Sequence, residues 1–531
     1  MSTKTDRILL AETELRCEVS SQEILSVQIT EGTAEIFGAE LALNKEYNFC
    51  GRNLAIFTWY GCKLTTEISP LVTGQSSMAG GSVASHLYVA SDSPMISYIN
   101  THIQLEARRD VALANNEKGP RILVVGQPDS GKTTMTKLLS NYALRLDRKP
   151  VLVDLDVDQG LNSMPGSMSA IPLLKSCISV DADCSNTTTP LIYSYGHANP
   201  KENFAYYKHS VYTLAKRVRE RLANDPEANA SGLVIDTCAW VDGSVAAASN
   251  TSLSSAESLN LIKFIANVFE VDIVLVMGAD KLYSTLSSEV SNVAINTGTE
   301  GASSLAAVHD SINKSAITDG DEAVLLQNRS TVVVKLFKSG GCVVRSAEAR
   351  RESRRRAIHE YFYGKSLCAH MTGTGGMVGS ASVPGNAYTL SPARVELKLS
   401  TLKLMRIGES ALQLTDGMRS IGDDTCEAAN PIELLPVKVA KANANDLRFT
   451  MLALVHATDG LSPLQALSES EEEVLVHNNV AGFLSVIDFT LDPNNPDDDS
   501  VVLLSPCPGG ELPGTKQLKY LFVGSIKHLE Q

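Results

Sequence analysis

The segment from Gly126 to Thr133 reads Gly-Gln-Pro-Asp-Ser-Gly-Lys-Thr, and its residue types could bind a nucleoside triphosphate. It matches the pattern of Gly, four residues, then Gly-Lys and Thr or Ser. In this pattern glycines let backbone N–H groups surround the phosphates. Lys132 could reach the β- and γ-phosphates, and the Thr133 hydroxyl could bind Mg²⁺. The candidate nucleotide-binding residues of this loop are Gly126, Asp129, Ser130, Gly131, Lys132, Thr133 and Thr134.

The elements on either side of this loop are those that the pattern requires. Arg121–Val125 is a continuous apolar run, which is typical of a strand buried on both faces. After the loop, Met135, Leu138, Leu139 and Tyr142 share one face of a predicted helix, whose N-terminal dipole would favour an anion. The alternative is a tight strand–helix turn with an exposed Lys132, and the flanking elements favour nucleotide binding over it.

Two acids end the next apolar run, Val151–Asp156, and they are candidates for metal binding or proton transfer. Asp154 and Asp156 are two residues apart, so in a strand they would face the same side of the sheet. One could hold Mg²⁺ and one could accept a proton from an attacking hydroxyl. Asp236, which closes another apolar run, competes for the metal role. A helix-capping role is the structural alternative for each of these acids.

Six arginines lie between Arg345 and Arg356, beside Glu348 and Glu352. On a helix, Arg350 and Arg354 are four residues apart, so both could face one site. Such a segment could form a lid over the γ-phosphate, or it could be a solvated basic helix. Trp240 follows a strand end and could stack on a nucleobase, although a core tryptophan is the common alternative.

The pattern leaves four classes of phosphate-loop protein open: motor ATPase, GTPase, metabolic kinase and nucleic-acid kinase. A GTPase would normally show Asn-Lys-x-Asp after a buried strand, whereas here the run Val271–Gly278 continues into Ala279, Asp280 and Lys281. No segment resembles helicase motifs. The residues alone therefore predict a phosphotransferase or an ATPase.

Apolar runs alternate with helical patterns through the centre of the chain, which predicts a doubly wound, mainly parallel sheet of the phosphate-loop NTPase type. The further predicted strands are Gly232–Thr237, Val271–Gly278 and Thr331–Leu336. We expect an α/β protein with an N-terminal β-sandwich-like domain (1–108), the phosphate-loop domain with its Arg-rich lid (109–372), a Gly- and Ser-rich linker (373–389) and a C-terminal β-rich α+β domain (390–531).

Composition narrows the class of protein further. The net charge of −14 over 531 residues argues against general coating of nucleic acid. No apolar run reaches the roughly 18–20 residues that a membrane span needs. The ten cysteines form no C-x-x-C pair, so reduced thiols in a cytoplasmic or nuclear protein are the simplest interpretation.

Several strings resemble the Clp family of polynucleotide 5′-hydroxyl kinases and pre-mRNA cleavage and polyadenylation factor subunits. They include ETELR at 12–16, GQPDSGKT, VDLDVDQG, TCAWVDG and KSGGCVVRS, and their order and spacing agree over most of the chain. The resemblance implies an N-terminal β domain, a central kinase domain and a C-terminal domain.

The resemblance also implies roles for particular residues. Lys132 and Thr133 would hold phosphates and Mg²⁺, and Asp156 would activate an RNA 5′-hydroxyl or support the metal. By the same resemblance Trp240 would stack on an RNA base, Arg345 and Arg350 would belong to the lid, and Glu14 would reach the adenine. Asn53 lies where kinase members often have a lysine, and further departures from the family pattern are Asp158, Ala239 and Phe337.

Two functions follow from this resemblance. The first is an ATP- and Mg²⁺-dependent kinase that phosphorylates the 5′-hydroxyl end of RNA, within nuclear pre-mRNA 3′-end processing. The second is a kinase-inactive subunit in which bound ATP stabilises an assembly with a scaffold subunit of the cleavage factor.

Overall fold

The structure is a computed structural model of the chain. It describes residues 3–20, 22–70, 84–161, 163–175, 180, 189–239, 254–296, 331–364, 390–408, 432, 434–437, 439–440, 443–456, 475–491, 498–506 and 519–528. Trp240 and the predicted linker at 373–389 lie outside these residues. Within the described parts of the chain, no helix combines the length and apolar character that crossing a membrane requires.

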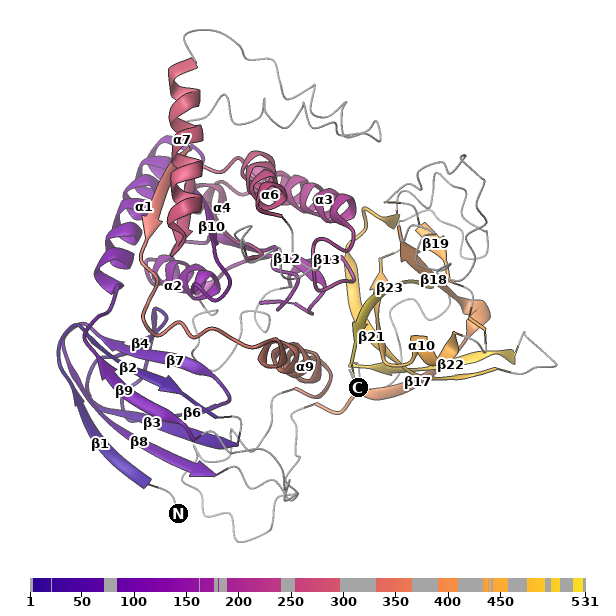
Figure 1. Cartoon of the computed structure of the whole chain (residues 1–531), viewed down its shortest axis with the longest axis horizontal. Coiled ribbons are helices and arrows are strands. Elements are labelled where there is room, and N and C mark those ends of the chain that lie inside the picture. The colour runs from indigo at the N-terminus through magenta and orange to yellow at the C-terminus, as the bar shows by residue number, and fades with distance from the viewer. Residues whose placement is uncertain are drawn as a thin grey trace.

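The N-terminal part of the chain forms two antiparallel sheets, with strand orders β1-β8-β3-β6 and β5-β4-β7-β2-β9 (Figure 1). The sheets enclose a common apolar core that includes Leu15, Leu25 and Ile56. Buried and less buried residues alternate along β3 and β6, as expected of strands with one core face. The strands are β1 (Thr3–Leu9), β2 (Thr13–Glu18), β3 (Glu23–Gly32), β4 (Glu35–Ile36), β5 (Ala39–Glu40), β6 (Glu46–Cys50), β7 (Asn53–Thr58), β8 (Cys62–Pro70) and β9 (His86–Ala90).

A long helix, α1 (Met95–Asn115), leads from this sandwich into the central domain. Its side chains Met95, Tyr98 and Leu105 share a core with residues of the central sheet. The boundary expected at residue 108 therefore falls inside a helix that packs on the central domain.

The central domain contains a seven-stranded sheet with the order β13-β12-β11-β14-β10-β15-β16. The neighbouring strands β11, β14, β10, β15 and β16 pair in parallel. At the other edge, β12 and β13 are antiparallel. The five apolar runs expected to form strands all do so, which confirms the α/β assignment. The strands are β10 (Arg121–Gly126), β11 (Val151–Asp154), β12 (Ser167–Pro172), β13 (Leu191–Ser194), β14 (Leu233–Asp236), β15 (Ile273–Met277) and β16 (Val332–Leu336).

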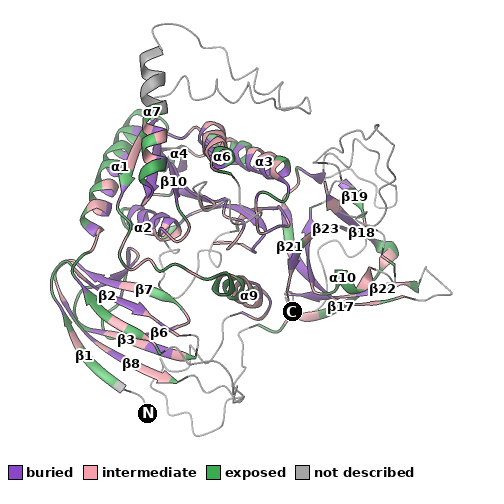
Figure 2. Ribbon diagram, viewed as in Figure 1, coloured by how far each residue is buried: buried purple, intermediate pink, exposed green. Residues whose placement is uncertain are grey.

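Helices cover both faces of this sheet, so its strands are largely buried (Figures 1 and 2). Ile122 and Val124 of β10 pack in the core shared with α1 and α2, whereas Leu123 and Val125 pack in the opposite core with α3 and α6. This division follows from the two-residue period of a strand. The other helices of the domain within the described residues are α2 (Lys132–Arg145), α3 (Phe204–Ala223), α4 (Pro226–Ser231), α6 (Ser255–Val268), α7 (Asp280–Asn296) and α9 (Ala347–Tyr363).

The C-terminal part forms another seven-stranded sheet, with the order β17-β22-β21-β20-β23-β18-β19. The sheet is antiparallel except where β18 runs parallel to β23, so this part is the β-rich α+β domain expected from the sequence. Its elements are β17 (Ala393–Lys398), η5 (Leu399–Thr401), β18 (Leu402–Ile407), β19 (Leu434–Pro436), α10 (Ala444–Leu447), β20 (Thr450–Val455), β21 (Val480–Thr490), β22 (Ser500–Ser505) and β23 (Lys519–Lys527).

Candidate functional site

The loop between β10 and α2 has the backbone of a phosphate-binding loop. Asp129 and Gly131 have positive φ angles of 54° and 89°, and a Cβ atom at Gly126 would lie 2.5 Å from the carbonyl oxygen of Met277. Gly131 is the N-cap of α2 and offers no side-chain cap, so the first N–H groups of the helix are available to an anion. The Ser130 hydroxyl is buried without a hydrogen-bond partner in the described structure.

Lys132, the first residue of α2, is buried beside this loop. Its Nζ donates a hydrogen bond to the carbonyl oxygen of Gln127, at 3.1 Å. Burial raises the pKa values of Asp156 and Asp236, and the positive charge of Lys132 partly opposes this rise. The lysine therefore lies between the loop and the acids of the neighbouring strands.

Asp236 is the acid that contacts the phosphate loop directly. The Thr133 hydroxyl donates to Asp236 Oδ2 at 2.6 Å, because β14 lies next to β10 and ends level with the loop. Asp154 is the register partner of Asp236, so the two carboxyl groups are neighbours. Burial and this mutual repulsion raise the pKa of Asp154 well above its ordinary value, and burial also raises the pKa of Asp236.

The sequence pattern predicts that Asp154 and Asp156 both lie at the end of one strand, and the structure differs from this prediction. β11 ends at Asp154, and Asp156 lies in the following loop. The physical reason is that Asp154 Oδ1 accepts a hydrogen bond from the Asp156 backbone N–H at 3.0 Å, while Oδ2 accepts one from the Leu161 N–H at 2.6 Å. Asp154 thus organises this loop, which is close to the capping alternative considered for it.

Asp156 has the electrostatic environment of a proton acceptor. Burial and the nearby Asp236 raise its pKa to about 7, although Lys132 opposes the shift. A carboxyl group with a pKa near neutrality can exchange a proton at the pH of the cell. Among the described residues, no group of three or more His, Cys, Asp and Glu side chains is arranged to hold a metal by itself.

The Arg-rich segment lies against the phosphate loop. Arg345 donates from its backbone N–H and its Nε to the two carboxylate oxygens of Asp129, at 3.0 and 2.8 Å, and Arg350 donates to Asp129 Oδ2 at 2.6 Å. Although burial opposes its ionisation, these hydrogen bonds and charges keep the pKa of Asp129 below its ordinary value. Arg354 pairs with Asp158, which Arg350 also approaches, so the predicted i, i+4 pair does face one site.

Glu14 is linked to the phosphate loop through the residues that it contacts. Its carboxylate is buried on β2 and accepts hydrogen bonds from Arg16 Nε at 2.6 Å and Ser93 Oγ at 3.1 Å. The Arg16 side chain packs beside Gly340 and Gly341, and the next residue, Cys342, packs against Gly131 of the phosphate loop. The N-terminal sandwich therefore borders the loop on its lid side. Asn53 is an exposed residue at the start of β7, where it pairs with Glu18.

The contacts of Asp129 with Arg345 and Arg350 are a feature of the site that sequence reasoning misses. The motif includes Asp129 only as a variable position, and nothing local connects it to arginines more than two hundred residues away. The position of Asp236 near the loop can be predicted from the sequence, since it ends an apolar run as Asp154 does. Trp240 lies outside the described residues, so its base-stacking role stays a prediction.

Comparison with family models matches three successive parts of the chain. The N-terminal beta-sandwich domain of polyadenylation factor matches residues 8–112, and the P-loop of mRNA cleavage and polyadenylation factor CLP1 matches residues 126–316. The model of pre-mRNA cleavage complex II protein Clp1 matches residues 390–530.

Individual relatives are similar over almost their entire length. A protein CLP1 homolog of Nematostella vectensis is 33% identical over 98% of this chain and 95% of its own. The polyribonucleotide 5′-hydroxyl-kinase Clp1 of Homo sapiens is 31% identical over 94% of this chain and 91% of its own. A solved complex of Clp1p with Pcf11p has the same fold, with a TM-score of 0.66 and 21% identity over 100% of this chain and 99% of that one.

Proposed function

This chain belongs to the Clp1 family of mRNA cleavage and polyadenylation factors, and we propose that it is an ATP-dependent kinase of RNA 5′-hydroxyl ends. The observation that supports this function best is the meeting of Lys132, Thr133, Asp156 and Asp236 at the carboxyl ends of adjacent parallel strands. Ligands in open α/β sheets bind at this end of the strands.

The loop residues fit the triphosphate of ATP. The N–H groups at the start of α2 would bind the phosphates, and the buried Ser130 hydroxyl would gain the partner that it lacks within the described protein. Lys132 would exchange its hydrogen bond to Gln127 for one to the phosphates. We place the adenine toward the N-terminal sandwich, near the Glu14–Arg16 pair; Asn53 is the other contact proposed there.

Thr133 and Asp236 are suited to bind Mg²⁺, and Asp156 is a further acid beside them. Asp154 shapes the loop that contains Asp156. The burial of these carboxyl groups raises their pKa values, and a cation would relieve the repulsion between them. Mg²⁺ normally takes only one or two protein ligands in such sites, together with phosphate oxygens and water, which agrees with the small number of acids available. When bound, Mg²⁺ offsets charge on the transferring phosphoryl group.

In this proposal Asp156 accepts the proton of the RNA 5′-hydroxyl as that oxygen bonds to the γ-phosphorus, while the bond from the γ-phosphorus to the β–γ bridging oxygen breaks and ADP leaves. Lys132 neutralises charge on the phosphates, and Arg345 and Arg350 supply further positive charge from the lid. Trp240 would stack on the terminal base of the RNA.

One observation favours the second candidate function, an assembly subunit that retains ATP without turning it over. Arg345 and Arg350 are already paired with Asp129, and Arg354 with Asp158, so the lid is held closed by the protein's own acids. A lid closed in this way would slow nucleotide exchange and keep the arginines away from the γ-phosphate.

We place either function in the pre-mRNA 3′-end processing machinery of the nucleus. The curated relatives include polyribonucleotide 5′-hydroxyl-kinases, and a solved relative, Clp1p, is in complex with Pcf11p. A cleavage-factor subunit in the place of Pcf11p is therefore the proposed scaffold partner of this chain.

The test is phosphate transfer from γ-labelled ATP to an RNA oligonucleotide with a 5′-hydroxyl. We expect labelled RNA with the wild-type protein and a loss of at least about a hundredfold for Lys132→Ala, because the lysine charge stabilises the transition state. Lys175→Ala is the matched control, since Lys175 pairs with Asp147 on the surface of the same domain. Absence of transfer, with ATP that co-purifies and resists exchange, would reject the kinase and support the assembly subunit.

A further inference from the structure

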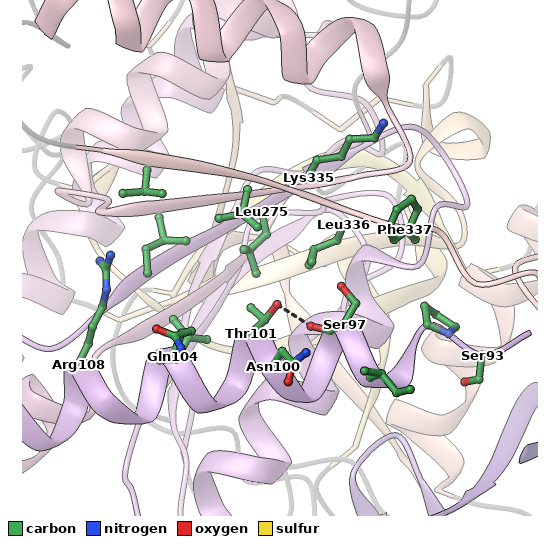
Figure 3. Close-up of a pocket in the computed structure, with 16 residues that line it drawn as sticks. Ser93, Ser97, Asn100, Thr101, Gln104, Arg108, Leu275, Lys335, Leu336 and Phe337 are labelled. Carbon is green, nitrogen blue, oxygen red and sulfur yellow. Dashed lines mark hydrogen bonds between the residues drawn. The ribbon is translucent and has the colours of Figure 1, made fainter. Parts of the chain in front are cut away.

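A groove of about 700 Å³ runs between α1 and the edge strand β16, away from the phosphate loop (Figure 3). Its floor is apolar and comes from the sheet, where Leu275, Val332 and Val334 contribute side chains. Its wall is the polar face of α1, which includes Asn100 and Gln104. The floor and wall together form a channel with an apolar base and a row of hydrogen-bonding groups along one side.

The open side of the groove is the backbone of β16, the last strand of the central sheet. The Val332 N–H donates to the Asp272 carbonyl, and the Leu336 carbonyl accepts from the Gly278 N–H. Because alternate residues of a strand direct their backbone groups to opposite neighbours, Val333 and Lys335 direct theirs outward. No further strand of the described chain lies on that side. Two N–H and two C=O groups therefore point along the rim of the groove.

The groove also exposes apolar side chains and positive charge. Ile96 and Phe337, at one end, are 54% and 67% exposed. Arg108 is at the other end, whereas Lys335 on the rim strand directs its side chain away from α1 (Figure 3), and its Nζ pairs with Asp280 of α7 at 2.8 Å. Among the described residues that line the groove, none is Asp or Glu. Arg108 therefore adds positive charge to one end of an apolar surface, in a chain with a net charge of −14.

We propose that this groove binds an extended segment of a partner protein, which adds a strand to β16. From Ser97 to Arg108 the helix wall is about 16 Å long, which matches roughly five residues of extended chain. The partner's backbone would bond to Val333 and Lys335, and its alternate apolar side chains would cover Val332, Val334 and Leu275. An Asp or Glu of the partner would face Arg108. The proposal is independent of phosphate transfer, since none of these residues belongs to the nucleotide site.

The test selects phage-displayed random peptides of about twelve residues, long enough to span the groove, on the full-length protein. Synthetic copies of the enriched peptides are then measured by fluorescence anisotropy. We expect enriched peptides with alternating apolar residues and at least one acid. Ile96→Glu should weaken their binding at least about tenfold, because the added carboxylate would be buried against them. Arg108→Glu should weaken binding of the acidic peptides by a similar factor.

Ile103→Glu is the matched control, because Ile103 is also 54% exposed on α1 but does not line the groove. It should leave peptide binding unchanged, and all three variants should bind a fluorescent ATP analogue like the wild type. Bound peptide should slow amide hydrogen exchange of Val333 and Lys335, whose N–H groups point outward.

Four results would overturn the proposal. The first is that the wild-type protein enriches no peptides beyond those that the Ile96→Glu variant enriches. The second is that Ile96→Glu and Ile103→Glu weaken peptide binding equally. A third is strong protection of the Val333 and Lys335 amides before any peptide is added, which would mean that the chain itself covers the strand. The fourth is a wild-type dimer that Ile96→Glu converts to a monomer, since the groove would then bind a second copy.

Discussion

Asp129 places a carboxylate within a loop whose backbone otherwise favours an anion. A negative charge at this position would repel phosphate if it were free. Instead the side chain is 2% exposed and bonded to Arg345 and Arg350, so its charge is balanced by the lid. Asp129 therefore does not act on the nucleotide as a bare acid, but it determines where two lid arginines lie.

Replacing Asp129 should loosen the lid. Asp129→Asn keeps an oxygen for the Arg345 backbone N–H but removes the charge that holds two guanidinium groups. Charge-assisted hydrogen bonds of this kind are worth about 1.5–3 kcal/mol each, so we expect dissociation of a fluorescent ATP analogue to become roughly tenfold faster or more. Stopped-flow displacement by unlabelled ATP measures this rate directly.

Glu352→Gln is the control for this prediction, because it removes the ion pair with Arg355 on the exposed side of the same helix. Its effect should be small, as it is for most surface ion pairs. If the two variants exchange nucleotide at the same rate, the Asp129 contacts do not hold the lid.

Sequence reasoning groups most readily the residues that are neighbours in the chain. Gly131, Lys132 and Thr133 are consecutive, so one motif places all of them. The partners of Asp129 and Thr133 lie on other strands and on α9, and their contacts arise only when the sheet forms. Long-range contacts of this kind cannot be read from local spacing.

Helix α9 changes character along its length, and this explains its position between the three domains (Figure 1). Its arginine-rich first half pairs with Asp129 of the phosphate loop and with Asp158 after β11, and Arg356 donates to the Gly51 carbonyl of the N-terminal sandwich at 2.8 Å. Its aromatic last half packs on the C-terminal domain, where the Tyr361 hydroxyl accepts from the Phe483 N–H at 2.9 Å. Most residues of α9 are exposed or half-buried (Figure 2).

The Tyr361 hydroxyl should matter for the attachment of α9. Tyr361→Phe would leave the Phe483 N–H without this acceptor, at a cost of about 1–3 kcal/mol. We expect faster amide hydrogen exchange in α9 and in residues 480–490, measured by mass spectrometry, and a lower melting temperature. Tyr60→Phe is the control, because Tyr60 is 88% exposed on the N-terminal sandwich. Unchanged exchange in both fragments of Tyr361→Phe would show that the bond does not attach the helix.

At the level of elements, the sequence predicted strands more reliably than the spaces between them. The apolar runs of β10, β14 and β15 are visible because each strand is buried on both faces, and β16 is also an apolar run although most of its residues are exposed or half-buried. The sequence does not predict the groove beside β16, because the groove depends on how α1 packs against the sheet. Nor does the sequence show that β16 is the edge strand. Sheet order is a property of the folded chain and leaves no periodic signal.

The three domains of the molecule are joined by close contacts, and a close backbone contact joins the central and C-terminal domains. The Ser525 N–H donates to the Gly196 carbonyl at 2.8 Å, and His197 Nδ1 lies 2.9 Å from the Ser525 hydroxyl. Gly524 allows this approach, since a Cβ atom there would lie 2.2 Å from the Gly196 oxygen. Only a residue without a side chain permits β23 to lie so near the chain after β13.

Gly524→Ala should therefore separate the C-terminal domain from the central one. The added methyl group would force the Gly196 backbone away, and the hydrogen bonds of Ser525 would be lost with it. We expect the melting temperature to fall by roughly 5 °C or more and trypsin to cleave between the domains. Gly482→Ala is the matched control in the same domain, because its nearest neighbour, the Tyr361 hydroxyl, would be 3.4 Å from the new Cβ. Equal stability of the two variants would show that the Gly196–Gly524 contact does not hold the domains together.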